Sequence, residues 1–253
     1  ASHLQLNIQE LGLSSFSIID DGEGMSFEDL PLAFCRHATS KISQFGDLYA
    51  LQSYGFRGEA LASIASVSKL TCTSYKSLKD FPGGKIVFHG GKLIKHIPLT
   101  KTDKDKGTKI LVEDLFYNTP ARLKFIRSKQ SEKNAIQKMT YALIMANYRR
   151  HFTLTLDSAP TKIYATSNTE TSCLKRFMDL ANIKESDKNQ IQHVQLSYEG
   201  HSLEGYVTIN SDSKRTGKVQ YTFCNGRYFI NQKLTYRLTS LMESIWGHRK
   251  TGH

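Results

Sequence analysis

A buried-type strand that ends in two carboxylates and two glycines is the feature that most restricts the fold of this chain. The apolar run 16–19 is followed directly by Asp-Asp-Gly-Glu-Gly at 20–24, and the alternating segment 4–8 precedes it. The two apolar segments predict a β-hairpin. In α/β sheets, polar side chains and glycines just beyond a strand are where ligands bind. A tight acidic turn without a ligand is the commoner alternative for such a pentapeptide.

A second glycine-rich motif, Gly-Phe-Arg-Gly-Glu-Ala-Leu, occupies residues 55–61 and leads into a helical pattern. Its glycines precede the helix start, where free N–H groups and the positive end of the helix dipole suit a phosphate. Because Asp20 can accept a hydrogen bond from a nucleobase amine, the two motifs together predict a nucleotide pocket. The polar stretch 37–55 between them predicts a lid. A local ion pair of Arg57 with Glu59 is the alternative, and Glu59 is assigned no catalytic role.

Two common nucleotide signatures are excluded by single residues. Phe27 stands where the dinucleotide fingerprint requires its third glycine, and Ile86 and Leu93 stand where a Walker loop requires Ser or Thr. The glycine pairs at 83–84 and 90–91 are therefore predicted to form hairpin turns.

Positive charge is concentrated in the second half of the chain. Lys and Arg number 34 against 23 Asp and Glu, a net charge of +11. Residues 1–117 carry 13 of each sign, so residues 118–253, with 21 basic and 10 acidic side chains, supply all of it. Such a potential attracts polyanions and favours nucleic acid as a partner. A basic surface that only maintains solubility is an equally good reading of charge alone.

The four cysteines are too far apart in sequence to form a close metal-binding pair. This spacing argues against a zinc finger and a disulfide scaffold, and we assign no metal ligands. No apolar run approaches the about 18 residues of a membrane span, and no leader pattern opens the sequence. We therefore expect an intracellular protein that does not enter the membrane.

Local signals predict the remaining elements. Ser26 with Asp29 resembles a capping box, and Thr119 before Pro120 predicts an N-cap with proline in the first turn. Helical spacing predicts a long helix over 131–148. The other predicted helices are 172–181 and 231–245, and the predicted strands are 152–156, 161–165, 192–197, 202–209 and 219–224.

Taken in order, the motifs resemble the MutL family of mismatch-repair ATPases. The resemblance rests on residues 20–25, 36–41, 55–61, 107–108, 114–122 and 225–227 and spans nearly the whole chain. It implies an α+β protein that begins with a GHKL (Bergerat-type) α/β sandwich ATPase domain over 1–118, lacking its first helix. A basic, DNA-binding domain like ribosomal protein S5 domain 2 is implied over 119–253, lacking its C-terminal segment.

Carried over residue by residue, the resemblance implies an ATP site. Asp20 is expected to contact the adenine amine, with Thr108 supporting it, while glycines shape the base pocket and the 55–58 turn lines the phosphates. The implied ATP-binding residues are Asp20, Gly22, Gly24, Met25, Thr39, Ser40, Lys41, Gly55, Phe56, Arg57, Gly58 and Thr108, with 39–41 in the lid. Arg227 is implied to contact a DNA phosphate, and an arginine that only caps a turn is the alternative.

The resemblance also implies ATP and Mg2+ as cofactors, but not a complete catalytic centre. The family's general base, a Glu, and its magnesium ligand, an Asn, are not found among these 253 residues. A family Lys near the γ-phosphate is also missing. We therefore assign no catalytic residue, and ATP hydrolysis rests on the family resemblance alone.

The implied function is that of a DNA mismatch repair ATPase module. In this reading ATP binding orders the lid and drives a dimerisation that clamps DNA and couples mismatch recognition to downstream repair. The expected partners are double- or single-stranded DNA, a MutL-type homo- or heterodimer partner and a mismatch-recognition protein of the MutS family. The expected location is the cytoplasm in a bacterium or the nucleus in a eukaryote. The alternative is a non-hydrolysing DNA-binding or heterodimer-scaffold subunit of the same repair system.

Overall fold

Two compact units make up the chain. The computed structural model describes residues 1–36, 58–76, 82–100, 106–126, 128–165, 172–208 and 220–246. The first unit comprises Ala1–Gln137 with Arg150–Ala165, and the second comprises Lys138–Arg149 with Thr166–His253. None of the described helices is long and apolar enough to cross a membrane.

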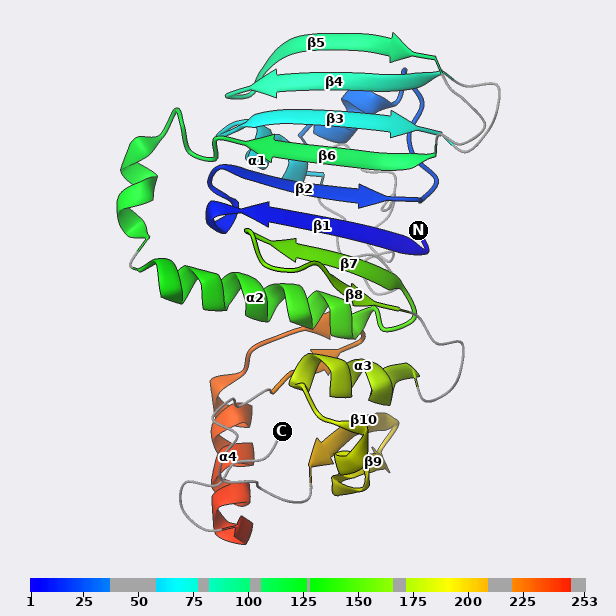
Figure 1. Ribbon diagram of the computed structural model, residues 1–253, viewed down its shortest axis with the longest axis vertical. Helices are drawn as coiled ribbons and strands as arrows, with labels where there is room; N and C mark the ends of the chain where they lie inside the picture. The colour runs from blue at the N-terminus through cyan, green and yellow to red at the C-terminus, as the bar shows by residue number, and fades with distance from the viewer. Residues whose placement is uncertain are drawn as a thin grey trace. The chain divides into compact units, whose positions relative to one another are not determined.

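An eight-stranded mixed sheet forms the frame of the first unit (Figure 1). Its strand order is β5-β4-β3-β6-β2-β1-β7-β8. Neighbouring strands are antiparallel except for β1 and β7, which pair in parallel. The strands are β1 (His3–Gln9), β2 (Ser15–Asp20), β3 (Lys69–Tyr75), β4 (Gly83–His89), β5 (Lys92–Leu99), β6 (Gly107–Glu113), β7 (His151–Leu156) and β8 (Lys162–Tyr164).

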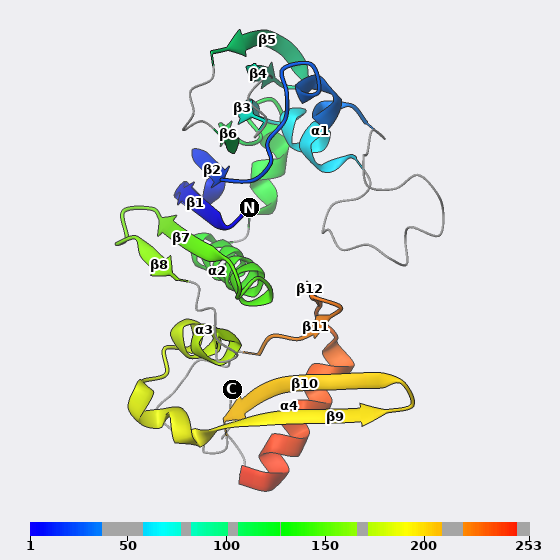
Figure 2. The ribbon, with the colours of Figure 1, turned by 90° about the vertical axis from the view of Figure 1, so that its right-hand side faces the viewer.

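A short helix, α1 (Ala60–Ala65), and a 3-10 turn, η2 (Leu30–Phe34), pack on one face of this sheet (Figure 2). Alternation explains the arrangement, because every second residue of β3 is buried while its neighbours are half-buried. The core beneath the two helical segments consists of Leu30, Phe34, Ala65, Leu70, Cys72, Ile86 and Val112.

Several predicted elements are confirmed. Segments 4–8 and 16–19 form the β1–β2 hairpin, and the long helix appears as α2 (Lys129–Ala146). The Ser26 hydroxyl accepts a hydrogen bond from the Asp29 amide at 3.2 Å and donates to its carboxylate at 2.7 Å. This cap is followed by the 3-10 turn η2 rather than by an α-helix.

Thr119 occupies the N-cap position with Pro120 in the first turn, as predicted, but the helical segment is short and the side chain does not cap it. The segment after it is a 3-10 turn, η4 (Pro120–Phe125), and Thr119 makes no side-chain cap hydrogen bond. Its hydroxyl oxygen is buried without a hydrogen-bond partner among the described residues. The threonine-proline signal therefore located the start of the turn, although the threonine side chain makes no capping hydrogen bond.

The boundary between the units lies elsewhere than the domain boundary expected between residues 118 and 119. Strands β7 and β8 extend the first sheet, because β7 pairs with β1 over His3–Ile8 and His151–Leu156. Helix α2, which precedes these strands, is divided between the two units. The pairing joins residues nearly 150 positions apart, a relation that local sequence patterns do not report.

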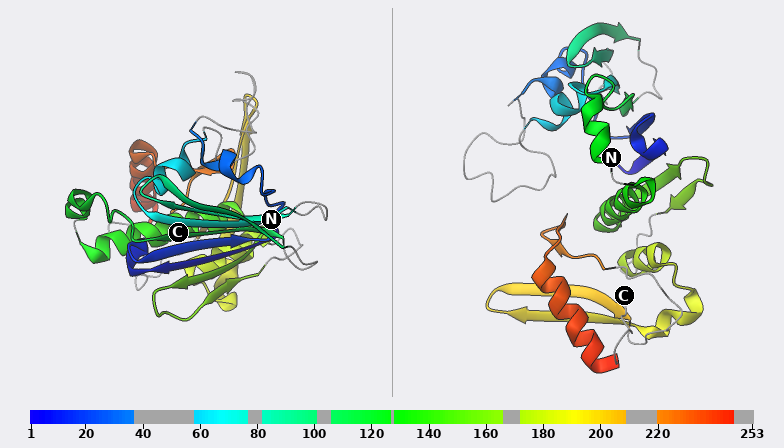
Figure 3. Two further views of the ribbon diagram at one scale, coloured as in Figure 1. Left: turned by 90° about the horizontal axis from the view of Figure 1, so that it is seen from above. Right: turned by 90° about the vertical axis from the view of Figure 1, so that its left-hand side faces the viewer.

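The described part of the second unit contains two small sheets, the C-terminal half of α2 and further helical segments (Figure 3). Its core consists of Phe177, Met178 and Ile183, with Ile191 and Tyr206 packed against them. Arg176 is only 2% exposed and donates hydrogen bonds to the carbonyls of Ile144 at 3.1 Å and Tyr148 at 3.2 Å. The elements are α3 (Ser172–Ala181), η5 (Glu185–Gln190), β9 (Ile191–Tyr198), β10 (His201–Thr208), β11 (Phe223–Cys224), β12 (Arg227–Tyr228) and α4 (Gln232–Trp246).

Candidate functional site

Three polar side chains form a row across adjacent strand ends of the first sheet. In the strand register Asp20 at the end of β2 lies opposite Thr108 near the start of β6, and Thr108 lies opposite Ser74 near the end of β3. Residues two apart on a strand share a face, and the core residues Ile110 and Cys72 lie on the helix-covered face. The polar row therefore lies on the same face of the sheet as the core, at the end of the sheet that is on the right in Figure 1.

Ser74 makes the most hydrogen bonds described in this row, and the sequence reasoning missed it. It is fully buried, and its hydroxyl accepts a hydrogen bond from the Met25 amide at 2.8 Å. It also donates to the Gly107 carbonyl at 3.2 Å and lies 2.8 Å from the Thr108 hydroxyl. Since a serine hydroxyl has one hydrogen, the donor in the contact with Thr108 is then Thr108. A polar residue on the buried side of an alternating strand was the available signal.

Two glycines allow the loop after β2 to lie against the ends of β3 and β6. Gly24 has φ +68°, and a Cβ there would lie 2.0 Å from the Tyr75 carbonyl oxygen. Gly107 has φ +85°, and a Cβ there would lie 2.0 Å from the Asp20 carbonyl oxygen. Any other residue would push these backbone segments apart, so both glycines are required by close approach and by conformation.

The adjacent carboxylates of Asp20 and Asp21 differ in their hydrogen bonds. Oδ1 of Asp20 accepts a hydrogen bond from the Gly22 amide at 2.8 Å. Within the part of the chain that the structure describes, Oδ2 of Asp20 accepts no hydrogen bond. The second oxygen therefore stays available as an acceptor, beside a glycine whose Cβ would lie only 2.6 Å from Oδ1.

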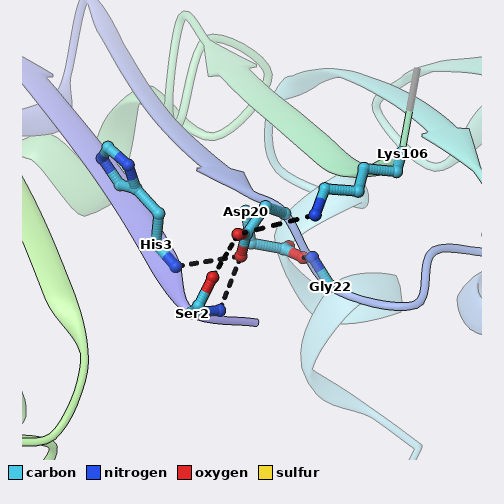
Figure 4. A network of polar contacts seen from close by, with 6 residues as sticks. Ser2, His3, Asp20, Gly22 and Lys106 are labelled. Atoms are coloured by element: carbon cyan, nitrogen blue, oxygen red, sulfur yellow. Dashed lines mark hydrogen bonds and ion pairs between the residues drawn. The ribbon is translucent and has the colours of Figure 1, made fainter. Parts of the chain in front are cut away.

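The carboxylate of Asp21 is instead used to hold the start of β1 (Figure 4). It accepts hydrogen bonds from the amides of Ser2 at 2.6 Å and His3 at 2.9 Å, and from the Ser2 hydroxyl. The ammonium of Lys106 lies 3.9 Å away. Partial burial works to raise the pKa of Asp21, but these hydrogen bonds, with the charge of Lys106, outweigh it and hold the pKa well below its usual range.

Part of the predicted phosphate motif lies on the same face of the sheet as the polar row. Gly58, with φ +65°, directly precedes the N-cap Glu59 of α1, and α1 packs in the core that also contacts Met25. The predicted residues Thr39, Ser40, Lys41, Gly55, Phe56 and Arg57 lie outside the described residues. The structure thus brings together Asp20, Gly22, Gly24, Met25 and Thr108, with Gly58 in the helical layer above the sheet.

Cys72 lies two residues before Ser74 on the same face and is fully buried. Burial, followed by the nearby charge of Asp20, raises the pKa of its thiol to about 12. Such a thiol stays protonated and unreactive near neutral pH, so its role is packing. Among the residues described, no three His, Cys, Asp or Glu side chains are grouped to hold a metal ion.

Arg227 lies in the second unit, at the start of β12. The preceding Asn225 and Gly226 both have positive φ, as a two-residue hairpin turn between β11 and β12 requires. The rings of Tyr221, Phe223 and Tyr228 form a cluster around this hairpin, with centroids 5.9 to 6.5 Å apart. Burial, followed by the neighbouring Tyr228, raises the pKa of Tyr221 to about 12. The cluster fixes the hairpin that carries Arg227.

The chain is similar in sequence to known proteins. The chain is 37% identical over 231 residues to the DNA mismatch repair protein MutL of Streptococcus sanguinis, and 35% identical over 234 residues to that of Staphylococcus carnosus. Each alignment covers 91% of this chain. The chain belongs to the MutL family. It spans 34% of the length of these two relatives, and no family model matches it.

Solved structures show the same fold for this MutL-family chain. The structure of the Aquifex aeolicus MutL ATPase domain complexed with ADP has a TM-score of 0.68 and 22% identity, and the match covers 95% of this chain and 80% of that one. The N-terminal domain of a DNA repair protein gives a TM-score of 0.73 at 18% identity, with 100% and 76% covered. This chain therefore has the same fold as these two solved structures.

Proposed function

We propose that this chain is the ATP-binding module of a DNA mismatch repair protein and that adenine binds at the polar row of the first sheet. The observation that carries the proposal is Asp20, whose Oδ2 is an open acceptor at the meeting point of three strand ends. The ADP bound to the Aquifex aeolicus relative supports an adenine nucleotide as the ligand.

The geometry of Asp20 favours adenine over guanine. Its Oδ1 is engaged by the Gly22 amide, so Oδ2 is the oxygen that would accept a hydrogen bond from the exocyclic amine of adenine. Guanine has a carbonyl oxygen at that position, and two acceptors repel each other. Gly22 and Gly24 lack side chains, which leaves room for a flat ring beside the carboxylate.

The phosphate end of the proposed site depends on the family resemblance. Gly55, Phe56, Arg57 and Gly58 would line the phosphates, and Thr39, Ser40 and Lys41 would belong to the lid. The described residues offer no cluster of metal ligands, so magnesium would arrive bound to the phosphates of ATP. There it would neutralise phosphate charge, while the residues of this chain would bind the nucleotide.

Calorimetric titration with ADP, ATP and GDP tests the proposal. We expect ADP and ATP to bind and GDP to bind at least about tenfold more weakly. Asp20→Asn should weaken ADP binding by about tenfold or more, because an amide can present its NH2 to the adenine amine once its oxygen bonds Gly22. Asp21→Asn is the matched control and should leave ADP affinity unchanged below its melting temperature. No ADP binding by the parent protein, or equal affinity in Asp20→Asn, would refute the assignment.

The repair function of the whole protein is part of the same proposal. We infer that ATP orders the lid and drives dimerisation with a second MutL-type chain, homo- or heterodimeric, that clamps DNA inside the cell. A MutS-family protein would supply the mismatch signal. The second unit, proposed to resemble ribosomal protein S5 domain 2, would contribute the basic DNA-binding surface. The excess of 21 basic over 10 acidic residues in 118–253 supports this part.

Arg227 provides the test of DNA binding. Arg227→Glu should lower the affinity for duplex DNA and reduce the slope of log affinity against log salt by about one. Lys184→Glu, an equal change of charge at an exposed position elsewhere in the second unit, controls for net charge. Identical salt titrations for the parent and Arg227→Glu would remove Arg227 from the DNA contact.

The alternative to an ATPase is a DNA-binding or heterodimer-scaffold subunit of the same repair system that binds nucleotide without hydrolysing it. Phosphate release at saturating ATP separates the two. Turnover supports the ATPase, and tight binding without turnover supports the alternative for this chain.

A further inference from the structure

Helix α1 has six residues, fewer than an isolated helix needs to be stable in water. Its position must therefore be fixed by contacts outside the helix. The last carbonyls of a helix have no partner within it, so the contacts at its C-terminal end are the first place to look.

Two of these carbonyls are satisfied locally. The Ser66 hydroxyl donates to the Ser63 carbonyl, and the Ser68 hydroxyl donates to the Ile64 carbonyl, both at 2.7 Å. Ser68 is fully buried, so its hydrogen bond is sheltered from water.

The next four carbonyls are bound by two segments that are distant in sequence. Gly91 donates its amide to Ala65 at 2.8 Å, and Gly90 donates its amide to Ser68 at 3.0 Å. Phe116 donates its amide to Val67 at 2.7 Å. Nδ2 of Asn118 donates to Ser66 at 3.0 Å. We call these four donors, Gly90, Gly91, Phe116 and Asn118, the clasp.

The clasp is built at a cost in backbone strain. Phe116 has φ +68° and Asp114 has φ +50°, conformations that residues with side chains adopt rarely. A Cβ on Gly90 would lie 2.9 Å from Nδ2 of Asn118, so the glycine gives Asn118 room to reach Ser66. Strained backbone persists where surrounding structure holds it and is concentrated at functional sites.

Three members of the clasp act through backbone amides, whereas Asn118 acts through its side chain. Its side chain is therefore the member that a substitution can remove without altering the backbone. It binds the carbonyl of Ser66, the C-cap residue of α1, whereas Gly58 precedes the N-cap residue Glu59 at the opposite end of the helix.

We propose that Asn118 is a positioning residue for the nucleotide site: it fixes α1, and with it Gly58, relative to the polar row of the sheet. This inference rests on the proposed function, in which Gly58 faces the phosphates and Asp20 faces the base. Asn118 touches no ligand. It sets the distance between the two ends of the site, so it affects ligands that span both ends.

The test compares ADP with adenosine, which lacks the phosphates. In Asn118→Asp the carboxylate cannot donate to the Ser66 carbonyl, so the hydrogen bond is lost with almost no change in shape. We expect the dissociation constant for ADP to rise about three- to tenfold and that for adenosine to stay unchanged. Hydrogen exchange of the α1 amides should increase in the same variant.

Asn147 provides a matched control. Its Nδ2 donates to the Leu143 carbonyl at 2.8 Å near the C-terminal end of α2, the same kind of contact at another helix. Asn147→Asp should lower thermal stability without changing the ratio of ADP to adenosine affinity. If Asn118→Asp does not fold, Asn118→Ala makes the same test, because Asn118 is exposed and water can then reach the Ser66 carbonyl.

The outcomes separate the two proposals. Unchanged ADP affinity in a folded Asn118 variant overturns the positioning role and leaves the proposed function standing. Equal losses for ADP and adenosine also overturn it, because they indicate a general loss of structure. Failure of the parent protein to bind ADP overturns both.

Discussion

The two ends of the first sheet use their polar groups in opposite ways. At one end Oδ2 of Asp20 accepts no hydrogen bond from the described residues, and it lies beside glycines that leave space. At the other end the clasp binds the carbonyls that follow α1. The first end can accept a ligand because its hydrogen-bonding capacity is incomplete, and the second is scaffold because its capacity is used. Asp21, next to Asp20, shows that the same residue type can serve either purpose.

Among the substitutions that test this difference between the two ends of the sheet, Gly24→Ala is expected to have the largest effect on stability. The new Cβ would lie 2.0 Å from the Tyr75 carbonyl oxygen, and residue 24 has a left-handed backbone conformation, so the backbone must move. We expect the free energy of unfolding to fall by more than about 3 kcal/mol, measured by urea denaturation.

Gly91→Ala is the counterpart at the clasp end. Gly91 has φ +83°, but the nearest atom to its new Cβ would be 3.4 Å away, so conformational strain acts without a severe clash. A loss of about 1 kcal/mol is expected. Equal losses at the two glycines would contradict the close approach described at Gly24.

Ser74→Ala should have the second largest effect. It leaves the partly buried Met25 amide without its acceptor and removes the contact with Thr108. We expect a loss of about 1 to 3 kcal/mol in denaturation and weaker ADP binding, because the loop after Asp20 is released. Thr73→Ala, on the opposite face of the same strand, should leave ADP affinity unchanged. A Ser74→Ala protein with parental stability and affinity would show that the row is not held by this hydroxyl.

Asp21→Asn tests the scaffold role of the second carboxylate through pH. The folded-state pKa of Asp21 is below its ordinary value, so its contribution to stability is present above the unfolded pKa of about 4 and is lost as pH falls through the folded pKa. We expect the variant to be less stable than the parent by about 1 kcal/mol at pH 7, with the difference shrinking below about pH 4. If the free energies of unfolding of the parent and of Asp21→Asn differ by the same amount, about 1 kcal/mol, at every pH from 2 to 7, the stabilisation does not come from the ionised carboxylate.

Lys69→Gln should have the smallest effect. Lys69 pairs with Asp114 at 2.7 Å next to the clasp, but the two side chains are 42% and 51% exposed. The hydrogen bond and the charge of Asp114 raise the pKa of Lys69, so the pair stays intact at neutral pH. Exposed pairs contribute little and are screened by salt. The melting temperature should change slightly at low salt and not at all at 1 M salt, and a large loss would make this pair part of the clasp.

Local patterns predicted much of the fold because neighbouring residues decide them. The alternation of segments 4–8 and 16–19, the Ser26 cap and the spacing of the long helix each depend on residues a few positions apart. The position of Asp20 at a strand end was predicted for the same reason. The role of Ser74 was not, because its partners Met25 and Thr108 are 49 and 34 residues away.

By itself the sequence determined most of the strands, the glycine turn at 90–91, the basic second half and the MutL motifs, since each depends on a short run of residues. The turn predicted at Gly83 and Gly84 is wrong, because both residues belong to β4 and pair with the neighbouring strands. Only the tertiary structure decided that β7 joins the first sheet, that Asp20 is open while Asp21 is engaged, and that Asn118 grips α1. These outcomes depend on which distant segments meet, and the hydrogen bonds that distinguish a site from its scaffold form only after that meeting.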